Sequence, residues 1–129
     1  MKERETEGPI SSIPMPIQIV RAAVTLDELR SVAGQQYGDF VKAVVDVKRG
    51  VMAIGGELHA DEEACLLQDG ARQADLWGIN LYPDRPTAEL IEFDSMINLR
   101  PSQGNRSRAV EDAAVRRQIQ DLVGRLVAP

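Results

Sequence analysis

The segment VKAVVDVKRGVMAIGGE, residues 41–57, limits the fold more than any other part of the chain. Apolar side chains occupy every second position in its first half, as they do on a half-buried β-strand. They are Val41, Ala43, Val45 and Val47. The letters KRG then place Gly50 where a turn needs a left-handed backbone, and an apolar run returns over residues 51–54. The segment therefore predicts an antiparallel hairpin, around which the remaining elements must pack.

The remaining segments predict further strands and helices around this hairpin. A short strand begins at residue 17, and Thr25 with Glu28 forms a capping box at the start of a helix. A short second helix follows Asp61, two strands follow at about residues 76–83 and 88–101, and an amphipathic helix runs from Asp112 to about residue 127. The predicted class is α+β, with a mostly antiparallel sheet of four to five strands and about three helices on one face. The first six elements follow a ferredoxin-like order.

Two regions of different composition are predicted. Residues 1–16 mix charges, glycine, serine and three prolines without periodicity, which predicts a flexible N-terminal tail. Residues 17–129 are predicted to form a single α+β domain. The face of its sheet that the helices leave uncovered is expected to be polar. It would show Lys42, Asp46, Asn80, Glu92, Asp94, Asn98 and Arg100.

Composition excludes several classes of protein. The chain of 129 residues is 43% hydrophobic, but it has no apolar run of about 18 residues, so no membrane span is expected. A single cysteine and the lack of an apolar leader favour the cytoplasm. A net charge of −5 and only five aromatic residues argue against a nucleic-acid partner.

Three motifs carry a resemblance to a known family. GGELHADEE, DLWGINLYP and IEFDSMINLRPSQGNRSR occur in this order, and the likeness extends over about residues 17–127. In these motifs the chain resembles a family of small uncharacterised bacterial proteins, which is known only as a domain of unknown function. The resemblance implies related proteins and no particular reaction.

The motif GGELHADEE supplies candidate catalytic residues. Glu57, His59 and Asp61 lie at alternate positions, so an extended backbone would place them on one side. Together with Asp94, Glu57 and His59 are the candidates for acid–base chemistry. Asp61 is also expected to cap the second helix. Because the chain has one histidine, no transition-metal site and no cofactor are expected.

The run RPSQGNRSR, residues 100–108, is the candidate ligand-binding loop. Its three arginines supply many hydrogen-bond donors just before a helix, where anions are stabilised. The same arginines could instead pair with internal carboxylates, so a structural loop is the alternative. The candidate ligand-binding residues are Asn80, Asn98, Arg100, Asn105, Arg106, Ser107 and Arg108.

Two classes of function follow from these residues. The first is a protein or enzyme of unassigned reaction that binds a small anionic molecule. The second is a non-enzymatic interaction or regulatory module that acts as a homo-oligomer, such as a homodimer formed through the polar sheet face or an exposed strand edge.

Overall fold

The fold is built around the predicted hairpin. A computed structural model describes residues 16–129, so residues 1–15 of the predicted tail lie outside the described part. Strands β3 (Val41–Asp46) and β4 (Val51–Ile54) pair in antiparallel fashion, and Gly50 in the turn has a φ of 72°. The predicted left-handed backbone at Gly50 is confirmed, and glycine is the residue that adopts this conformation without strain.

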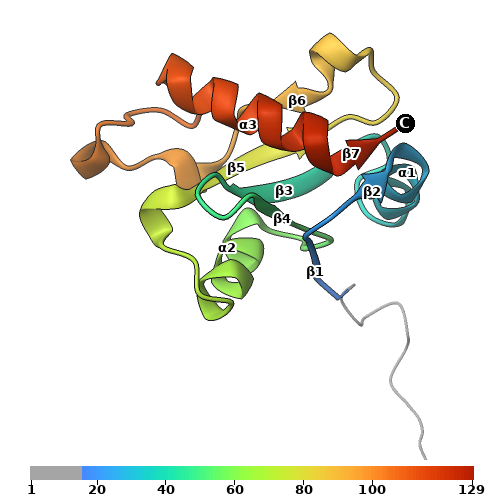
Figure 1. Cartoon of the computed structure of the whole chain (residues 1–129), viewed down its shortest axis with the longest axis horizontal. Helices are drawn as coiled ribbons and strands as arrows, with labels where there is room; N and C mark the ends of the chain where they lie inside the picture. The colour runs from blue at the N-terminus through green and yellow to red at the C-terminus, as the bar shows by residue number, and fades with distance from the viewer. Residues whose placement is uncertain (1–15) are drawn as a thin grey trace, which may run out of the picture.

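Three further strands complete an antiparallel sheet in the order β1-β4-β3-β5-β6 (Figure 1). They are β1 (Gln18–Val20), β5 (Leu76–Leu81) and β6 (Ile91–Glu92). A separate two-stranded parallel sheet joins β2 (Val24–Thr25) to β7 (Val127–Ala128). The α+β class and the five-stranded antiparallel sheet are confirmed.

The three α-helices of residues 16–129 are divided between the two faces of the sheet. They are α1 (Leu26–Gln35), α2 (His59–Gln68) and α3 (Ala113–Leu126). Leu29 of α1 and Ile119 of α3 belong to the larger core, together with Ala43 and Val45 of β3. The intervening β3 residue Val44 packs instead in a second core with Leu66 of α2. The prediction of three helices on one face is therefore wrong, because α2 lies on the opposite face (Figure 1).

The strand order explains this division. The connection from β1 through α1 to β3 passes over β4, and the connection from β4 through α2 to β5 passes over β3 in the same lateral direction. Since β1 and β4 run in opposite directions, two crossovers of the same hand must place their helices on opposite faces. A ferredoxin-like order would return the last of these four strands beside β1, but β5 lies beside β3, so that expectation is also wrong.

The predicted strand over residues 88–101 is interrupted after two residues. Only Ile91–Glu92 pairs with β5, and the chain then folds into a 3₁₀ turn, η4 (Met96–Asn98). The Ser95 hydroxyl caps this turn by accepting a hydrogen bond from the backbone N–H of Ile97, at 3.3 Å. Ser95 also lies directly over Gly78, where a Cβ atom would come within 2.5 Å of the serine side chain. Close packing of a turn against β5 replaces the predicted strand.

Three further 3₁₀ turns lie in the connections of the described residues. They are η2 (Gln73–Asp75), η3 (Thr87–Glu89) and η5 (Pro101–Gln103).

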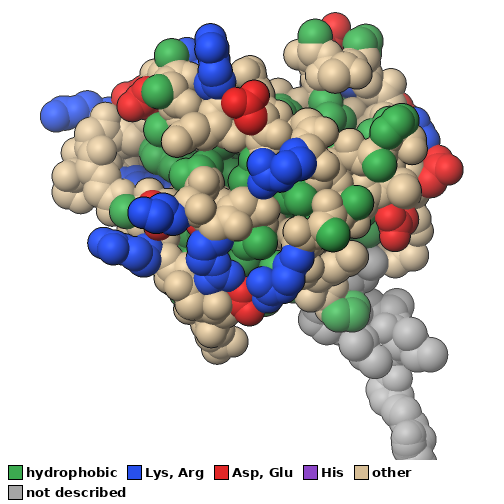
Figure 2. All heavy atoms as spheres, in the orientation of Figure 1, with side chains coloured by type: hydrophobic (Ala, Val, Ile, Leu, Met, Phe, Trp, Pro, Cys, Tyr) green, Lys and Arg blue, Asp and Glu red, His purple; other side chains and the backbone are tan. Residues whose placement is uncertain are grey.

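The helix starts agree in part with the sequence. The Thr25 and Glu28 capping box at α1 is confirmed. Helix α3 begins after Asp112, whose side chain caps it by accepting from the N–H of Ala114. Figure 2 shows that the face carrying α3 has many Lys and Arg side chains, although the chain as a whole is acidic.

Candidate functional site

A pocket of about 450 Å³ opens where the start of α2 meets β3, β5 and the segment after β6. Sheet residues form its floor, and residues of α2 and η4 form two of its sides. Its lining consists of Phe40, Lys42, Leu58, His59, Ala60, Asn80, Tyr82, Glu92, Asp94, Ser95, Met96, Ile97 and Arg108. This is the volume of a site for a small molecule, and apolar walls with a few converging polar groups are typical of such sites.

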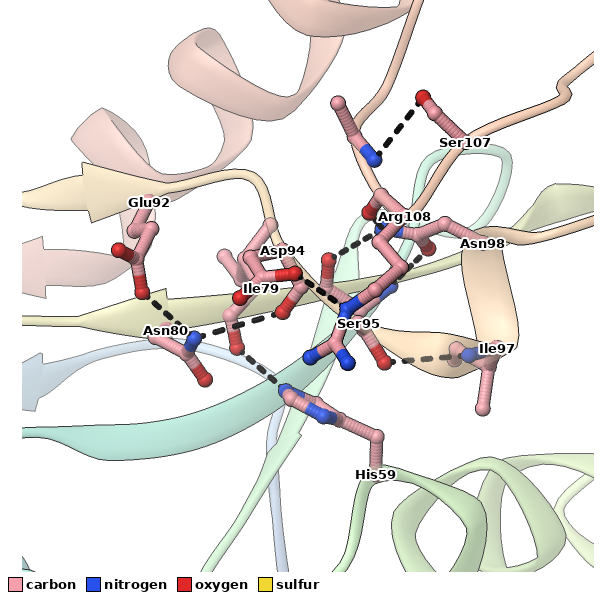
Figure 3. Close-up of polar contacts among 12 residues, drawn as sticks. His59, Ile79, Asn80, Glu92, Asp94, Ser95, Ile97, Asn98, Ser107 and Arg108 are labelled. Atoms are coloured by element: carbon pink, nitrogen blue, oxygen red, sulfur yellow. Dashed lines mark hydrogen bonds and ion pairs between the residues drawn. The ribbon is translucent and has the colours of Figure 1, made fainter.

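Lys42 and Asn80 lie side by side on the floor. They are directly opposed residues of β3 and β5, so their side chains project from the same face of the sheet. The Asn80 amide nitrogen donates to Glu92 Oε1 at 2.8 Å and to the Asp94 carbonyl at 3.3 Å (Figure 3). These two acceptors fix the orientation of the amide, and they leave Asn80 Oδ1 buried with no hydrogen-bond partner among the described residues. Such an unpaired buried acceptor is unusual in a folded protein.

His59 begins α2 at one side of the pocket and is buried. Its Nε2 lies 2.8 Å from the carbonyl oxygen of Ile79 (Figure 3). Because a carbonyl can only accept, Nε2 carries the hydrogen and Nδ1 carries the lone pair. Burial lowers the pKa of His59, and the nearby charge of Lys42 also lowers it, so the imidazole is neutral at pH 7. A neutral imidazole is a proton acceptor, which makes His59 the group best suited to acid–base chemistry in this pocket.

The two carboxylates at the pocket are already paired. Asp94 Oδ1 accepts from Arg108 Nε at 2.7 Å (Figure 3). Glu92 Oε1 accepts from Asn80 and from the Tyr82 hydroxyl, the latter at 3.1 Å. The ammonium group of Lys42, by contrast, has no ion pair with any described carboxylate. It lies 4.9 Å from the centre of the Tyr37 ring, where a cation–π interaction orients it.

Stacked aromatic rings form the wall of the pocket next to Lys42. Phe40 lies between Tyr37 and Tyr82, with ring centres 4.8 and 5.3 Å away. The Arg85 guanidinium covers the other face of Tyr82 at 3.6 Å. Since both faces of Phe40 and of Tyr82 are occupied, the rings are a rigid wall and offer no free surface for a stacked base.

Asn98 and Arg100, two of the predicted ligand-binding residues, instead bind the outer edge of β5. The Asn98 side chain is fully buried, accepts from the backbone N–H of Gly78 at 2.8 Å and donates to the Gly78 carbonyl at 2.9 Å. The Arg100 guanidinium donates to the carbonyls of Leu76, Gln73 and Ile97 and stacks on Trp77. These side chains therefore continue the sheet beyond the short β6, where an additional strand would otherwise pair. The sequence predicts both side chains on the polar sheet face, and this prediction is wrong.

The other residues of the predicted loop either hold the loop together or point away from the pocket, except for Arg108. The Asn105 amide is buried and donates to the carbonyls of Asn98, Ser107 and Ala109, so it holds the loop closed. Ser107 accepts from the N–H of Ala109. Arg106 is exposed and does not line the pocket. Of the three arginines in RPSQGNRSR, the structure brings only Arg108 to the pocket, together with Asn80 from β5.

The catalytic candidates are also separated. His59 and Asp94 line the same pocket, whereas Glu57 lies in a neighbouring depression beside Tyr37. Helix α2 begins at His59 with Leu58 as its N-cap residue, so the prediction that Asp61 caps this helix is wrong. Because His59 and Asp61 lie within this helix, no extended backbone aligns them with Glu57 on one side.

A buried carboxyl group follows His59 on the inner face of α2. Glu62 is fully buried, and its Oε2 accepts from the N–H of Gly56 at 3.0 Å, while Oε1 has no partner among residues 16–129. Burial raises the pKa of Glu62 well above its usual value, so the carboxyl group remains protonated at pH values where an exposed glutamate is ionised.

Other chemistry finds less support. Within residues 16–129, no group of three or more His, Cys, Asp or Glu side chains is arranged to hold a metal ion. Ser95 lies at the pocket with His59 and Asp94, but its hydroxyl caps η4, and no described hydrogen bond joins the three side chains into a relay. Cys65 is half-buried on α2 and does not line the pocket.

Lys42 lines the pocket, although the sequence predicts it only as part of the polar sheet face and not as a ligand-binding residue. A usable signal was present, because a lysine interrupts the apolar strand VKAVV just as Asn80 interrupts WGINL. Leu58 and Met96 carried no such signal, since isolated apolar residues outside strands are common on protein surfaces.

The fold and the pocket define a small α+β protein whose sheet is covered by helices on both faces and hollowed at one end by a polar pocket. The chain belongs to the family described as "Protein of unknown function (DUF5674)", which matches residues 18–126. No curated protein and no solved structure matches the chain. Among the described residues, no helix is long and apolar enough to cross a membrane.

Proposed function

We propose that the protein binds a small anionic molecule in the pocket between α2, β5 and η4, with the Lys42 ammonium group as its main partner. The observation that carries the proposal is the difference between the charged groups of the pocket. Asp94 and Glu92 have partners, whereas Lys42 faces the same space without a described carboxylate. A charge-assisted hydrogen bond to Lys42 is therefore available to an incoming anion.

The surrounding residues support an anion at this position. Arg108 lines the mouth and adds a second positive charge, although Asp94 already binds it. His59 is neutral and therefore adds no charge to the anion site, but its imidazole can accept or donate a proton if a reaction takes place. Of the predicted ligand-binding residues, Arg108 is thus kept for the anion, and Lys42 is added. Asn80 lines the same pocket, but its free Oδ1 can only accept a hydrogen bond from a donor group.

The test uses two lysine variants with the same substitution. Melting curves of the wild type, Lys42→Met and Lys48→Met are recorded with acetate and with inorganic phosphate. Lys48 is an exposed lysine in the β3–β4 turn and serves as the control. An anion at ten times its dissociation constant adds about 1.4 kcal/mol to the free energy of unfolding, or roughly 3–6 °C for a chain of this length.

The rise in melting temperature should appear in the wild type and in Lys48→Met and should be lost in Lys42→Met. An equal rise in all three proteins would place the anion elsewhere and contradict the proposal.

We further propose that the protein acts in the bacterial cytoplasm. The single cysteine supports this location, because no internal disulfide that would require an oxidising compartment can form. The alternative function is a non-enzymatic interaction or regulatory module that works as a homo-oligomer. Sedimentation velocity of the purified protein, with and without anion, distinguishes a monomer from a dimer.

A further inference from the structure

The pocket has a polar floor and an apolar mouth. Asn80 at the floor and the adjoining polar residues His59 and Ser95 are all at least nine-tenths buried. Leu58 and Met96, which line the same pocket from two different elements, are 54% and 60% exposed. Two large apolar side chains left in water on opposite sides of one opening require an explanation, because each gains stability when it is covered.

Exposed apolar side chains are concentrated around this opening. The large hydrophobic residues that remain exposed in the described part of the chain are Tyr37, Leu58, Leu67, Met96 and Leu99. Leu58 and Met96 line the pocket, and Tyr37 lies beside Leu58 in the adjoining depression. Half-buried Phe40 and Ile97 extend the apolar surface from the mouth toward the floor. A clustered apolar surface of this kind is typical of a binding site, whereas scattered exposed residues are not.

The volume of the pocket exceeds what a bare anion fills. A water molecule occupies about 30 Å³ in the liquid, and acetate or phosphate is equivalent to only a few water molecules. A ligand held at Lys42 alone would therefore leave most of the 450 Å³ unfilled. The unfilled part is the part with apolar walls.

The charges limit the ligand to a single negative charge. The lining carries the positive charges of Lys42 and Arg108 and the negative charges of Glu92 and Asp94, and among these only Arg108 and Asp94 form an ion pair. A monoanion can pair with Lys42, but a second negative charge would lie near Glu92 or Asp94 in a partly dehydrated space and would be repelled.

We infer that the ligand is an amphiphilic monocarboxylate. Its carboxylate pairs with Lys42 at the floor, and its apolar body extends outward between Leu58 and Met96. This inference rests on the proposed function, since it requires an anion at Lys42, and it adds the chemical class of the ligand.

A series of straight-chain carboxylates tests the inference. Binding of acetate, butyrate, hexanoate and octanoate is measured by titration calorimetry with the whole chain. Each added methylene that enters an apolar environment should tighten binding by about two- to fourfold, until the chain has passed the mouth. Suberate has the length of octanoate with a second carboxylate at its end. It should bind at least tenfold more weakly than octanoate, because this second charge would lie against the apolar side chains of the mouth.

Two serine variants provide the matched comparison. Leu58→Ser combined with Met96→Ser should reduce the gain per methylene to less than 1.5-fold. Leu67→Ser, at an exposed leucine of α2 outside the pocket lining, should behave as the wild type.

The outcomes separate this inference from the proposed function. If every carboxylate binds equally and all lose affinity in Lys42→Met, the anion site stands and the amphiphilic ligand is wrong. If no carboxylate depends on Lys42, both are wrong. If the double serine variant instead converts a dimer into a monomer in sedimentation velocity, a second copy of the chain covers the mouth, and the inference is overturned.

Discussion

Replacement of Asn98 by alanine should destabilise the protein strongly, although the sequence offers Asn98 as a ligand-binding residue. The Asn98 amide occupies the place of a strand residue beside β5. It satisfies the N–H of Gly78, the carbonyl of Gly78 and the carbonyl of Arg108, at 2.8, 2.9 and 2.9 Å. The alanine variant leaves both Gly78 groups without a partner, whereas the Arg108 carbonyl still accepts from the N–H of Ser95 at 3.0 Å. The site is fully buried, so water cannot replace the amide without local opening.

The expected loss can be estimated from the two unsatisfied Gly78 groups and the one further hydrogen bond lost at the Arg108 carbonyl. An unsatisfied buried polar group costs about 1–3 kcal/mol, and partial relaxation of the 3₁₀ turn reduces the sum. We expect the free energy of unfolding to fall by about 3–5 kcal/mol. With an m value of about 2 kcal/mol per molar urea, the midpoint of unfolding should fall by roughly 2 M.

Trp77 fluorescence in urea is the assay. It is the single tryptophan of the chain, it belongs to the core, and the Arg100 guanidinium lies 4.2 Å from its ring. Gln118→Ala, which removes an exposed amide on α3, serves as the control and should change stability by less than about 0.5 kcal/mol. A loss below about 1 kcal/mol for Asn98→Ala, with an unchanged m value, would refute the role of Asn98 as a substitute for a strand.

Three further predictions concern the core, the glycines and the buried carboxyl group. Ile119→Ala should cost about 2–4 kcal/mol in urea unfolding, because the side chain is fully buried and a cavity remains; a change of a few tenths would contradict its place in the core. Gly78→Ala should destabilise by about 1–3 kcal/mol, since its Cβ meets Ser95 at 2.5 Å, whereas Gly124→Ala, with open space around it on α3, should stabilise by about 0.5–1 kcal/mol; equal effects would refute the close approach. Burial raises the pKa of Glu62 in the folded state, so this group stabilises fully below pH 4.5 and its contribution is lost as the pH rises toward the folded pKa. Glu62→Gln cannot ionise, and its stability relative to the wild type should therefore rise between pH 5 and 8, by at most about 1.4 kcal/mol per pH unit; a difference independent of pH would contradict the buried acid.

Local patterns predicted the local structure well. The alternation in residues 41–47 gave the β3 strand, and Thr25 with Glu28 gave the start of α1, because both depend on neighbours within a few residues. Trp77, Ile79 and Leu81 alternate with Gly78 and Asn80 along β5, and all three lie in the larger core.

Long-range packing limited the other predictions. Alternation after Ile91 indicated a continuous strand, but the Asn98 side chain bonds to the backbone of β5, 20 residues away, and the chain must turn to bring it there. The sequence places the start of α2 three residues late, because its buried stripe includes His59 and Glu62, which do not resemble an apolar face. The pocket itself depends on which strands are neighbours, and strand order is not encoded in any single segment.

The parallel pair of β2 and β7 determines the order in which the chain can assemble. Val24 pairs with Val127 and Thr25 with Ala128, so the partners are separated by about 100 residues. Closing a loop of this length costs about 4 kcal/mol of chain entropy beyond a constant, unless the intervening elements have folded first. During synthesis on the ribosome, β2 must wait until residues 127–128 have emerged. Because Thr25 is also the N-cap of α1, the first helix acquires its final anchorage only when the end of α3 docks, and completion of the fold is a late, non-local event.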